Sequence, residues 1–111
     1  METTRQQKIA RLIQKDLGVY FQQHSSLFEG ALITVTKVYV TGDLSIAKAY
    51  ISLFATRDKH ALIEKIRLHA REIRRHLGIK ERYQLRVIPE LHFFEDDSLD
   101  YIDNLDNLLK Q

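Results

Sequence analysis

Apolar residues recur every three or four positions near the start of the chain, a spacing that predicts an amphipathic helix. The stripe runs from Ile9 to Phe21, and Thr3 or Thr4 can cap the first turn. The helix should therefore cover about residues 4–23. Gly18 weakens this helix, so we expect it to mark a close packing contact.

After a loop over residues 24–30, two segments alternate between apolar and polar side chains. Residues 32–40 (LITVTKVYV) and 44–54 (LSIAKAYISLF) are also rich in residues that favour strands. Thr41-Gly42-Asp43 has the composition of a turn, with Gly42 available for a positive φ. Together these segments predict an antiparallel β-hairpin.

A second helical stretch follows over about residues 58–77, with Thr56 or Asp58 at its start and Gly78 as its stop. Its apolar stripe consists of Ile63, Ile66, Ala70, Ile73 and Leu77. Ala70 is the only small residue of the stripe. It marks either a close contact with the sheet or a kink that divides the stretch into two helices, and periodicity does not decide between them.

The remaining chain predicts one more strand and one more helix. Residues 82–94 should form the strand, and Pro89, which lacks an amide hydrogen, places it at an edge or at a bulge. Ser98 can cap a helix over about 98–109. A helical crossover would return the third strand to the sheet of the hairpin. We therefore expect a single α+β domain over residues 1–111, with a three-stranded mixed sheet and helices on one face.

Composition excludes several classes of protein. The chain has no cysteine, so disulfide scaffolds, thiolate metal sites and cysteine nucleophiles are excluded, and a reducing cytoplasm fits. No apolar run is long enough for a signal peptide or a membrane span, so we expect no membrane association.

The net charge of +2 conceals a polarised chain. Residues 57–86 hold ten Lys and Arg against four acids, whereas residues 87–111 hold one Lys against seven acids. The two segments therefore carry +6 and −6, and a polyanion partner becomes plausible for the first of them.

Four arginines at helical spacing provide the strongest candidate for a binding site. This arginine ridge consists of Arg67, Arg71, Arg74 and Arg75, which should point outward. Guanidinium groups make planar, bidentate contacts with phosphate, which suits a nucleic-acid backbone, although a merely solvated helix face is the alternative. Further basic residues that could extend the surface are Lys80, Arg82, Arg86, Arg5, Lys8 and Arg11.

The acidic and histidine residues give no comparable case for catalysis. Asp96, Asp97 and Asp100 could bind Mg²⁺ or Ca²⁺, but EF-hand spacing is absent and carboxylates are common in a first helical turn. The five histidines form no zinc-binding motif, and no nucleotide-binding or nucleophile motif is present. We expect no metal, no cofactor and no enzymatic activity.

Two segments resemble the bacterial ribosome-binding factor A family. VTGDLSIAKAYI is similar to the family pattern V-[ST]-x-D-L-x-x-A-x-V-Y-V, with Ala49 and Ile51 in place of the usual valines. LRVIPELHFFEDDSLD is similar to R-x-x-P-E-L-x-F-x-x-D-x-S, and Arg5, Lys8 and Ile9 resemble the opening helix of the family. The matching residues are Val40, Thr41, Asp43, Leu44, Ala47 and Tyr50 in the first segment, and Arg86, Pro89, Glu90, Leu91, Phe93, Asp96 and Ser98 in the second.

The resemblance implies a type II KH-like fold, α-β-β-α-α-β, with a helix break near Ala70. It also implies a cytoplasmic, monomeric, non-enzymatic factor that binds the small (30S) ribosomal subunit and 16S rRNA. Such a factor assists late maturation and processing of 16S rRNA, often in cold adaptation. The GXXG loop of typical KH domains is missing, as in the family, but the second small residue expected beside Ala70 is also missing.

A different class of function stays open beside this one. The Pro89 strand and the acidic C-terminal segment also suit a small α+β regulatory or protein-interaction domain that associates through an exposed sheet edge.

Overall fold

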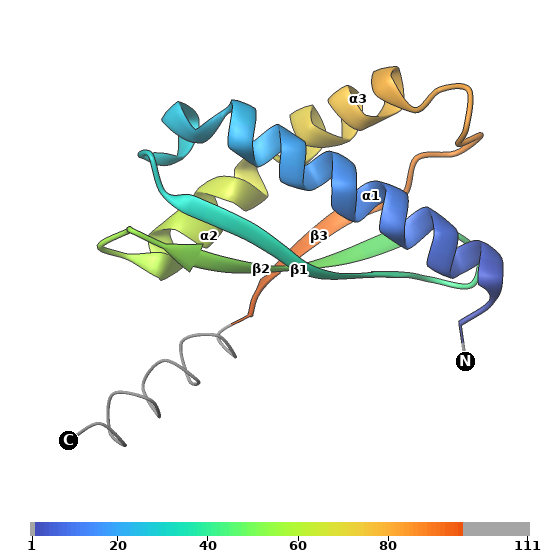
Figure 1. The fold of residues 1–111 in the computed structure, drawn as a ribbon, viewed down its shortest axis with the longest axis horizontal. Helices are drawn as coiled ribbons and strands as arrows, with labels where there is room; N and C mark the ends of the chain where they lie inside the picture. The colour runs from blue at the N-terminus through green and yellow to red at the C-terminus, as the bar shows by residue number, and fades with distance from the viewer. Residues whose placement is uncertain (1, 97–111) are drawn as a thin grey trace.

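The computed structural model describes residues 2–96, in the order α-β-β-α-α-β that the resemblance implied (Figure 1). The elements are α1 (Thr4–Gln23), the short 3₁₀ helix η1 (Ser25–Phe28), β1 (Leu32–Val40), β2 (Ile46–Phe54), α2 (Lys59–Leu68), α3 (Ala70–Lys80) and β3 (Glu90–Glu95). The predicted helix at about 98–109, with Ser98, Asp97 and Asp100, lies outside the described residues.

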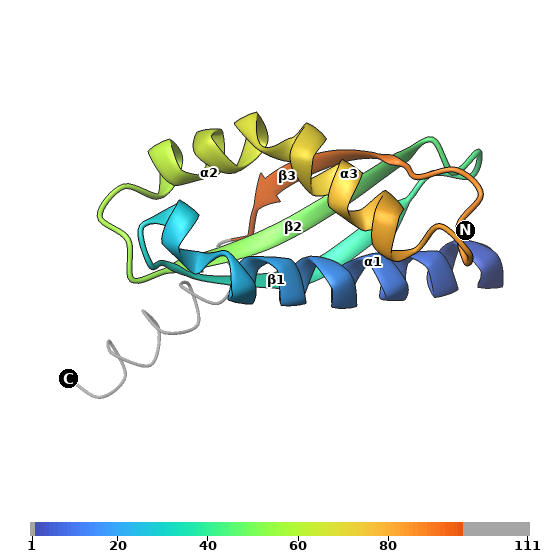
Figure 2. The same ribbon diagram turned by 90° about the horizontal axis from the view of Figure 1, so that it is seen from above.

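The three strands form one mixed sheet, as predicted, and their order is β1-β2-β3. β1 pairs antiparallel with β2, and β2 pairs parallel with β3 through the α2–α3 crossover. All three helices cover the same face: α1 runs along β1, and α2 and α3 lie on the β3 side (Figures 1 and 2). The opposite face of the sheet is covered by none of these helices.

The core lies between this helical layer and one face of the sheet. Phe21 of α1 contacts Phe28 and Phe93 edge to face, with ring centroids 5.6 and 6.1 Å apart, and all three side chains are fully buried. Ile66 of α2 and Ile73 of α3 are buried in the same cluster. The core therefore ties each helix to the sheet.

The start of α1 is fixed to the first strand by a capping box. The Thr3 hydroxyl accepts a hydrogen bond from the backbone amide of Gln6 at 3.1 Å, and Gln6 Oε1 accepts one from the backbone amide of Thr3 at 2.8 Å. Gln6 Nε2 also donates to the Val40 carbonyl at 2.9 Å, and Gln14 Nε2 donates to the Val35 carbonyl at 3.1 Å. Two glutamines of α1 thus satisfy carbonyls of the edge strand β1.

The turn between β1 and β2 uses a residue other than the predicted glycine. Leu44, not Gly42, has the positive φ, at 62°. Asp43 accepts hydrogen bonds from the Thr41 hydroxyl at 2.7 Å and from the Ser45 hydroxyl and amide, and these bonds lower the pKa of the Asp43 carboxyl. The turn therefore extends to Ser45, and β2 begins two residues later than predicted.

The second helical stretch is divided, as the resemblance implied. α2 ends at Leu68 and α3 begins at Ala70, so the break falls at His69. His69 Nδ1 lies 2.9 Å from the Lys65 carbonyl oxygen, and its ring packs edge to face on Phe28 at 5.3 Å. The break is thus held by contacts of His69 with α2 and with η1.

Two glycines have roles that differ from the predictions. Gly78 does not stop the helix, because α3 continues to Lys80; a Cβ there would lie 3.3 Å from Ile88 Cγ1, so this glycine permits the following loop to pack closely. Gly18 was expected at a close contact, but among residues 2–96 no atom other than the nearby backbone of α1 lies within 4 Å of the position of its missing Cβ.

The third strand is shorter than predicted, because residues 81–89 form turns and irregular structure. Tyr83 is 86% exposed and Val87 is 65% exposed, so the alternation of this segment does not reflect burial against the core. Pro89 directly precedes β3, which is an edge strand, as the proline predicted.

Two carboxyl groups are buried together where α1 meets the end of α3. Asp16 and Glu81 are each 5% exposed, and Lys80 Nζ lies 3.3 Å from Asp16 Oδ1. The hydrogen bond between the Glu81 and Asp16 carboxyls, together with burial and the charge of Asp16, raises the pKa of Glu81. This site therefore favours the protonated form of Glu81.

The first prediction concerns Gly18. Gly18→Ala should raise the free energy of unfolding by about 1 kcal/mol, because alanine favours the helix and meets no neighbouring atom. Gly30→Ala is the matched control and should lower it by about 1 kcal/mol, since Gly30 has a φ of 71°. Urea denaturation at neutral pH measures both values. A loss of stability in Gly18→Ala would contradict the open environment of this residue.

The second prediction concerns Glu81→Gln. Because the pKa of Glu81 is raised in the folded protein, its contribution to stability is fully present below the unfolded value of 4.5 and is lost as the pH rises through the folded value. A neutral amide can donate to Asp16 at any pH. The variant should therefore have a higher melting temperature than the wild type at pH 7 and nearly the same one at pH 4.

Thermal unfolding as a function of pH tests this, with Glu95→Gln at the exposed end of β3 as the control. Equal effects of the two variants at pH 7 would show that the buried pair carries no such penalty.

Candidate functional site

The four side chains of the arginine ridge are all exposed, but they differ in what they bind. Arg67, at the end of α2, donates from Nε to the Phe93 carbonyl at 3.0 Å and forms an ion pair from Nη1 to Glu64 at 2.7 Å. Its guanidinium therefore reaches from the helix to the backbone of β3.

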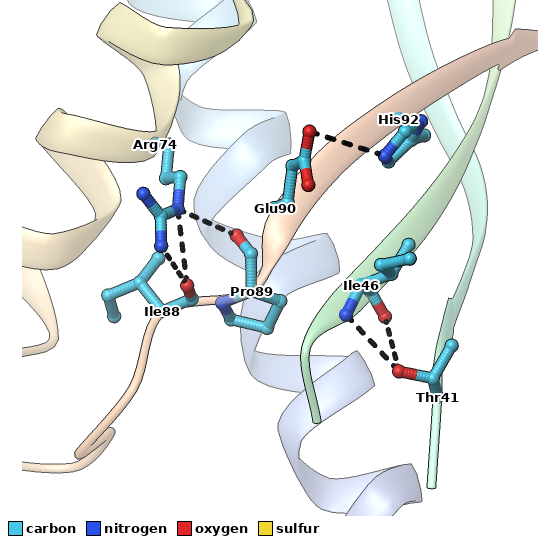
Figure 3. Close-up of polar contacts among 7 residues, drawn as sticks. All are labelled: Thr41, Ile46, Arg74, Ile88, Pro89, Glu90 and His92. Atoms are coloured by element: carbon cyan, nitrogen blue, oxygen red, sulfur yellow. Dashed lines mark hydrogen bonds and ion pairs between the residues drawn. The ribbon is translucent and has the colours of Figure 1, made fainter. Parts of the chain in front are cut away.

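Arg74 of α3 holds the backbone just before the same strand. Its Nε and Nη2 donate to the Ile88 carbonyl at 3.1 and 2.7 Å, and Nε also lies 3.2 Å from the Pro89 carbonyl (Figure 3). The backbone amide of Glu90 donates to the Ser45 carbonyl in the turn before β2. Because backbone groups alternate in direction along a strand, the carbonyls of Pro89 and Phe93 point away from β2. Arg67 and Arg74 thus cap carbonyls on the outer edge of β3.

Of the other two ridge arginines, Arg75 is paired with an acidic side chain, and Arg71 has no such partner among the described residues. Arg75 forms a bidentate pair with Glu72, at 2.6 and 3.1 Å, which lowers the pKa of Glu72 and raises that of Arg75. Arg71 is exposed and makes no hydrogen bond or ion pair within residues 2–96. Arg71 is therefore the ridge residue best placed to bind an anion.

Adjacent grooves join the ridge to basic residues far away in the sequence. The edge groove lies between the α2–α3 junction and β3 and is lined by Arg67, Ala70, Arg71 and residues 90–94. A second groove, of about 800 Å³, shares Arg71 with it and runs between α3 and residues 86–88. A third shares Arg86 with the second and reaches Arg5 and Lys8 of α1 beside the β1–β2 turn, and a fourth shares Lys8 with the third and reaches Arg11.

The structure therefore brings most of the predicted basic residues into grooves that share lining residues. We call this the basic surface; it consists of Arg5, Lys8, Arg11, Arg67, Arg71, Arg74, Arg75 and Arg86. Arg5, Lys8, Arg11, Arg71 and Arg86 form no ion pair with any described residue. Unpaired, exposed cations that converge from separate segments attract an extended polyanion.

Two predicted residues do not line these grooves. Lys80 pairs with the buried Asp16, and the Arg82 guanidinium lies over the Tyr83 ring at 4.7 Å, with Nη2 donating to the phenol oxygen at 2.6 Å. Conversely, sequence reasoning did not place Asp43–Ser45 or Gln84 beside the basic residues, because only the fold brings the β1–β2 turn and the loop after α3 together.

The described residues offer little for other kinds of site. No group of three or more His, Asp or Glu side chains within residues 2–96 is arranged to hold a metal ion. None of the described helices is both long enough and apolar enough to cross a membrane.

Comparison with known proteins identifies the family of this chain. A family model described as ribosome-binding factor A matches residues 5–109. The chain belongs to the ribosome-binding factor A family. It is 40% identical over 112 residues to the ribosome-binding factor A of Cytophaga hutchinsonii, covering 100% of this chain and 84% of that protein. It is 45% identical to that of Christiangramia forsetii, covering 98% and 85%.

Solved structures of ribosome-binding factor A share the fold. The crystal structure from Thermus thermophilus gives a TM-score of 0.67 at 20% identity, over 81% of this chain and 94% of that one. The solution structure of a Thermotoga maritima protein of the same description has a TM-score of 0.64 and 24% sequence identity, and the match covers 88% of this chain and 92% of that one. A homology model of the Thermus thermophilus factor was fitted into a cryo-EM map of its complex with the 30S subunit. It has a TM-score of 0.53 and 22% sequence identity, and the match covers 69% of this chain and 90% of that one.

The division of roles among the ridge arginines is testable by stability. Arg74→Met should lower the free energy of unfolding by about 1–2 kcal/mol, because the variant loses the donors to the Ile88 and Pro89 carbonyls. Arg75→Met is the matched control on the next residue and should leave the unfolding midpoint nearly unchanged, since its partner is an exposed carboxylate. Urea denaturation measures both. Equal effects would contradict a structural role for Arg74.

Proposed function

We propose that this protein binds the small (30S) ribosomal subunit through its basic surface, contacts 16S rRNA there, and assists late maturation of that RNA without catalysing a reaction. The observation that carries the proposal is that Arg86 lines both the groove that contains the cations of α1 and the groove that contains those of α3. Family membership agrees with it, as does the Thermus thermophilus relative fitted into a map of its 30S complex.

The chemistry of the basic surface suits RNA phosphates rather than base edges. Its unpaired guanidinium and ammonium groups are exposed along shallow grooves, where they can each reach a phosphate oxygen. Such contacts set the position and orientation of a folded RNA and carry little sequence information. The protein would then stabilise one local RNA conformation until processing is complete.

The ridge arginines divide this work. Arg71 and Arg75 are placed to contact phosphate, whereas Arg67 and Arg74 act as positioning residues, because they hold β3 and residues 88–89 against the helices. The grooves on both sides of Arg71 keep their shape only while those backbone segments stay in place.

The break between α2 and α3 takes the place of the GXXG loop in a type II KH-like domain. Ala70 lines the edge groove between Arg67 and Arg71. Its methyl group leaves room for an RNA backbone to approach the helix start, as the glycines do in typical KH domains. In this respect Ala70 matters for its small size and not as a hinge.

We place this activity in the cytoplasm, with a monomeric protein. Misfolded RNA helices persist longer at low temperature, so a factor that stabilises the correct local conformation matters most in the cold. Association through a sheet edge has less support, because carbonyls on the outer sides of β1 and β3 already accept hydrogen bonds from helix side chains.

Charge reversal on the basic surface tests the proposal. Arg71→Glu and Arg86→Glu should each weaken binding to purified small subunits about tenfold or more, since each replaces a phosphate contact by repulsion. In a plot of the logarithm of the affinity against the logarithm of the salt concentration, the slope should also become less steep, by about 0.7–0.9 for each lost contact.

Arg57→Glu is the matched control, because Arg57 is also exposed but lies outside these grooves. Sedimentation with small subunits at several salt concentrations gives both quantities. Unchanged affinity of Arg71→Glu and Arg86→Glu relative to Arg57→Glu would overturn the assignment of this surface.

A further inference from the structure

The face of the sheet opposite the helices carries a row of aromatic side chains, one from each strand. Tyr39 of β1 and Tyr50 of β2 lie edge to face with ring centroids 6.0 Å apart. Tyr50 and Phe94 of β3 are stacked at 5.4 Å with an interplanar angle of 28°. We call these three residues the aromatic row.

The alternation of the strands explains why these rings are not part of the core. Their neighbours Val40, Ala49 and Phe93 are buried on the helical side of the sheet. Tyr39 is 37% exposed, and Tyr50 and Phe94 are half-buried. Because the helices already supply a complete core on the other face, packing of the core does not require three adjacent aromatic residues here.

A cation lies over the ring at each end of the row. Lys37 Nζ is 4.4 Å from the centroid of Tyr39, and Arg67 Cζ is 6.0 Å from that of Phe94. The face therefore combines flat π surfaces with positive charge. A peptide or a second copy of this chain has no particular need of that combination, whereas a single-stranded nucleic acid presents both bases and phosphates.

The row is also continuous with the basic surface. Arg67 and Phe94 both line the edge groove, which contains Arg71 as well. Arg67 passes around the outer edge of β3, since it starts on α2, donates to the Phe93 carbonyl and ends over the Phe94 ring. An RNA strand bound at Arg71 can thus continue around this edge onto the open face of the sheet.

We propose that the aromatic row is a second RNA-binding site, which stacks unpaired bases while the basic surface holds phosphates of the same strand. Three rings in a row on a sheet can take about two or three bases. The bases must be unpaired, because those of a duplex are already stacked on one another. The inference rests on the proposed function in that RNA is the partner, but it concerns a different site and a different chemistry.

Binding of the full-length protein to a short RNA tests this site without ribosomal subunits. The probe is a single-stranded RNA of about 10 nucleotides with 2-aminopurine at its centre, whose fluorescence is quenched when the base stacks. Tyr39→Leu and Phe94→Leu keep apolar bulk and remove the ring. Each should weaken binding about tenfold and abolish the quenching.

Two controls separate stacking from attraction of phosphates. Tyr83→Leu removes an exposed tyrosine that also has an arginine over its ring, but outside the aromatic row, and should bind like the wild type. A strand of the same length with abasic central nucleotides should bind the wild type and Tyr39→Leu equally.

The results also distinguish this inference from the proposed function. Wild-type affinity and quenching in both Tyr39→Leu and Phe94→Leu would overturn the aromatic row as a base-binding site, even if Arg71→Glu still loses affinity for small subunits. Wild-type dimers that Tyr39→Leu dissociates would overturn it as well, because the face would then pair two copies of this chain. Loss of base stacking in these variants supports it, whatever the behaviour of the charge-reversal variants.

Discussion

A three-stranded sheet covered on one face has two open edges, and the polar backbone groups on those edges need partners. In this protein the helices that cover the face also supply the donors. Gln6 and Gln14 of α1 bind carbonyls of β1, while Arg67 and Arg74 bind the Phe93, Ile88 and Pro89 carbonyls at β3. These bonds fix the lateral position of each helix on the sheet, and the position of every groove in the basic surface follows from it.

Prediction from the sequence succeeded where burial and periodicity coincide. α1 and β1 match their predicted bounds, because the buried residues of each recur on the side that faces the core. The segment before β3 misled the prediction, since Tyr83 and Val87 alternate with polar residues without being buried. The two helical glycines show the same limit: whether a glycine meets a neighbour depends on the path of a distant segment, such as Ile88 beside Gly78, and no local pattern contains that information.

The candidate site shows a similar boundary between composition and fold. The run of arginines and the charge of residues 57–86 could be recognised in the sequence. Their separate roles could not be recognised there, because Arg74 and Arg75 are adjacent residues of the same type. Only the path of the chain before β3 places two carbonyls within hydrogen-bond distance of Arg74. Likewise, Tyr39 and Tyr50 share a face by alternation, but the register of β3 is needed to bring Phe94 beside them.

The parallel pairing of β3 with β2 has a consequence for how the molecule acquires its binding capacity. Partners such as Ala49 and Phe93 are joined by the whole α2–α3 crossover, so this pairing closes the longest loop of the sheet and is entropically the most costly. Docking of β3 completes the edge groove and the aromatic row in one step, since both include Phe94. A chain in which only the hairpin and α1 have folded therefore presents neither, so both features exist only in protein that has finished folding.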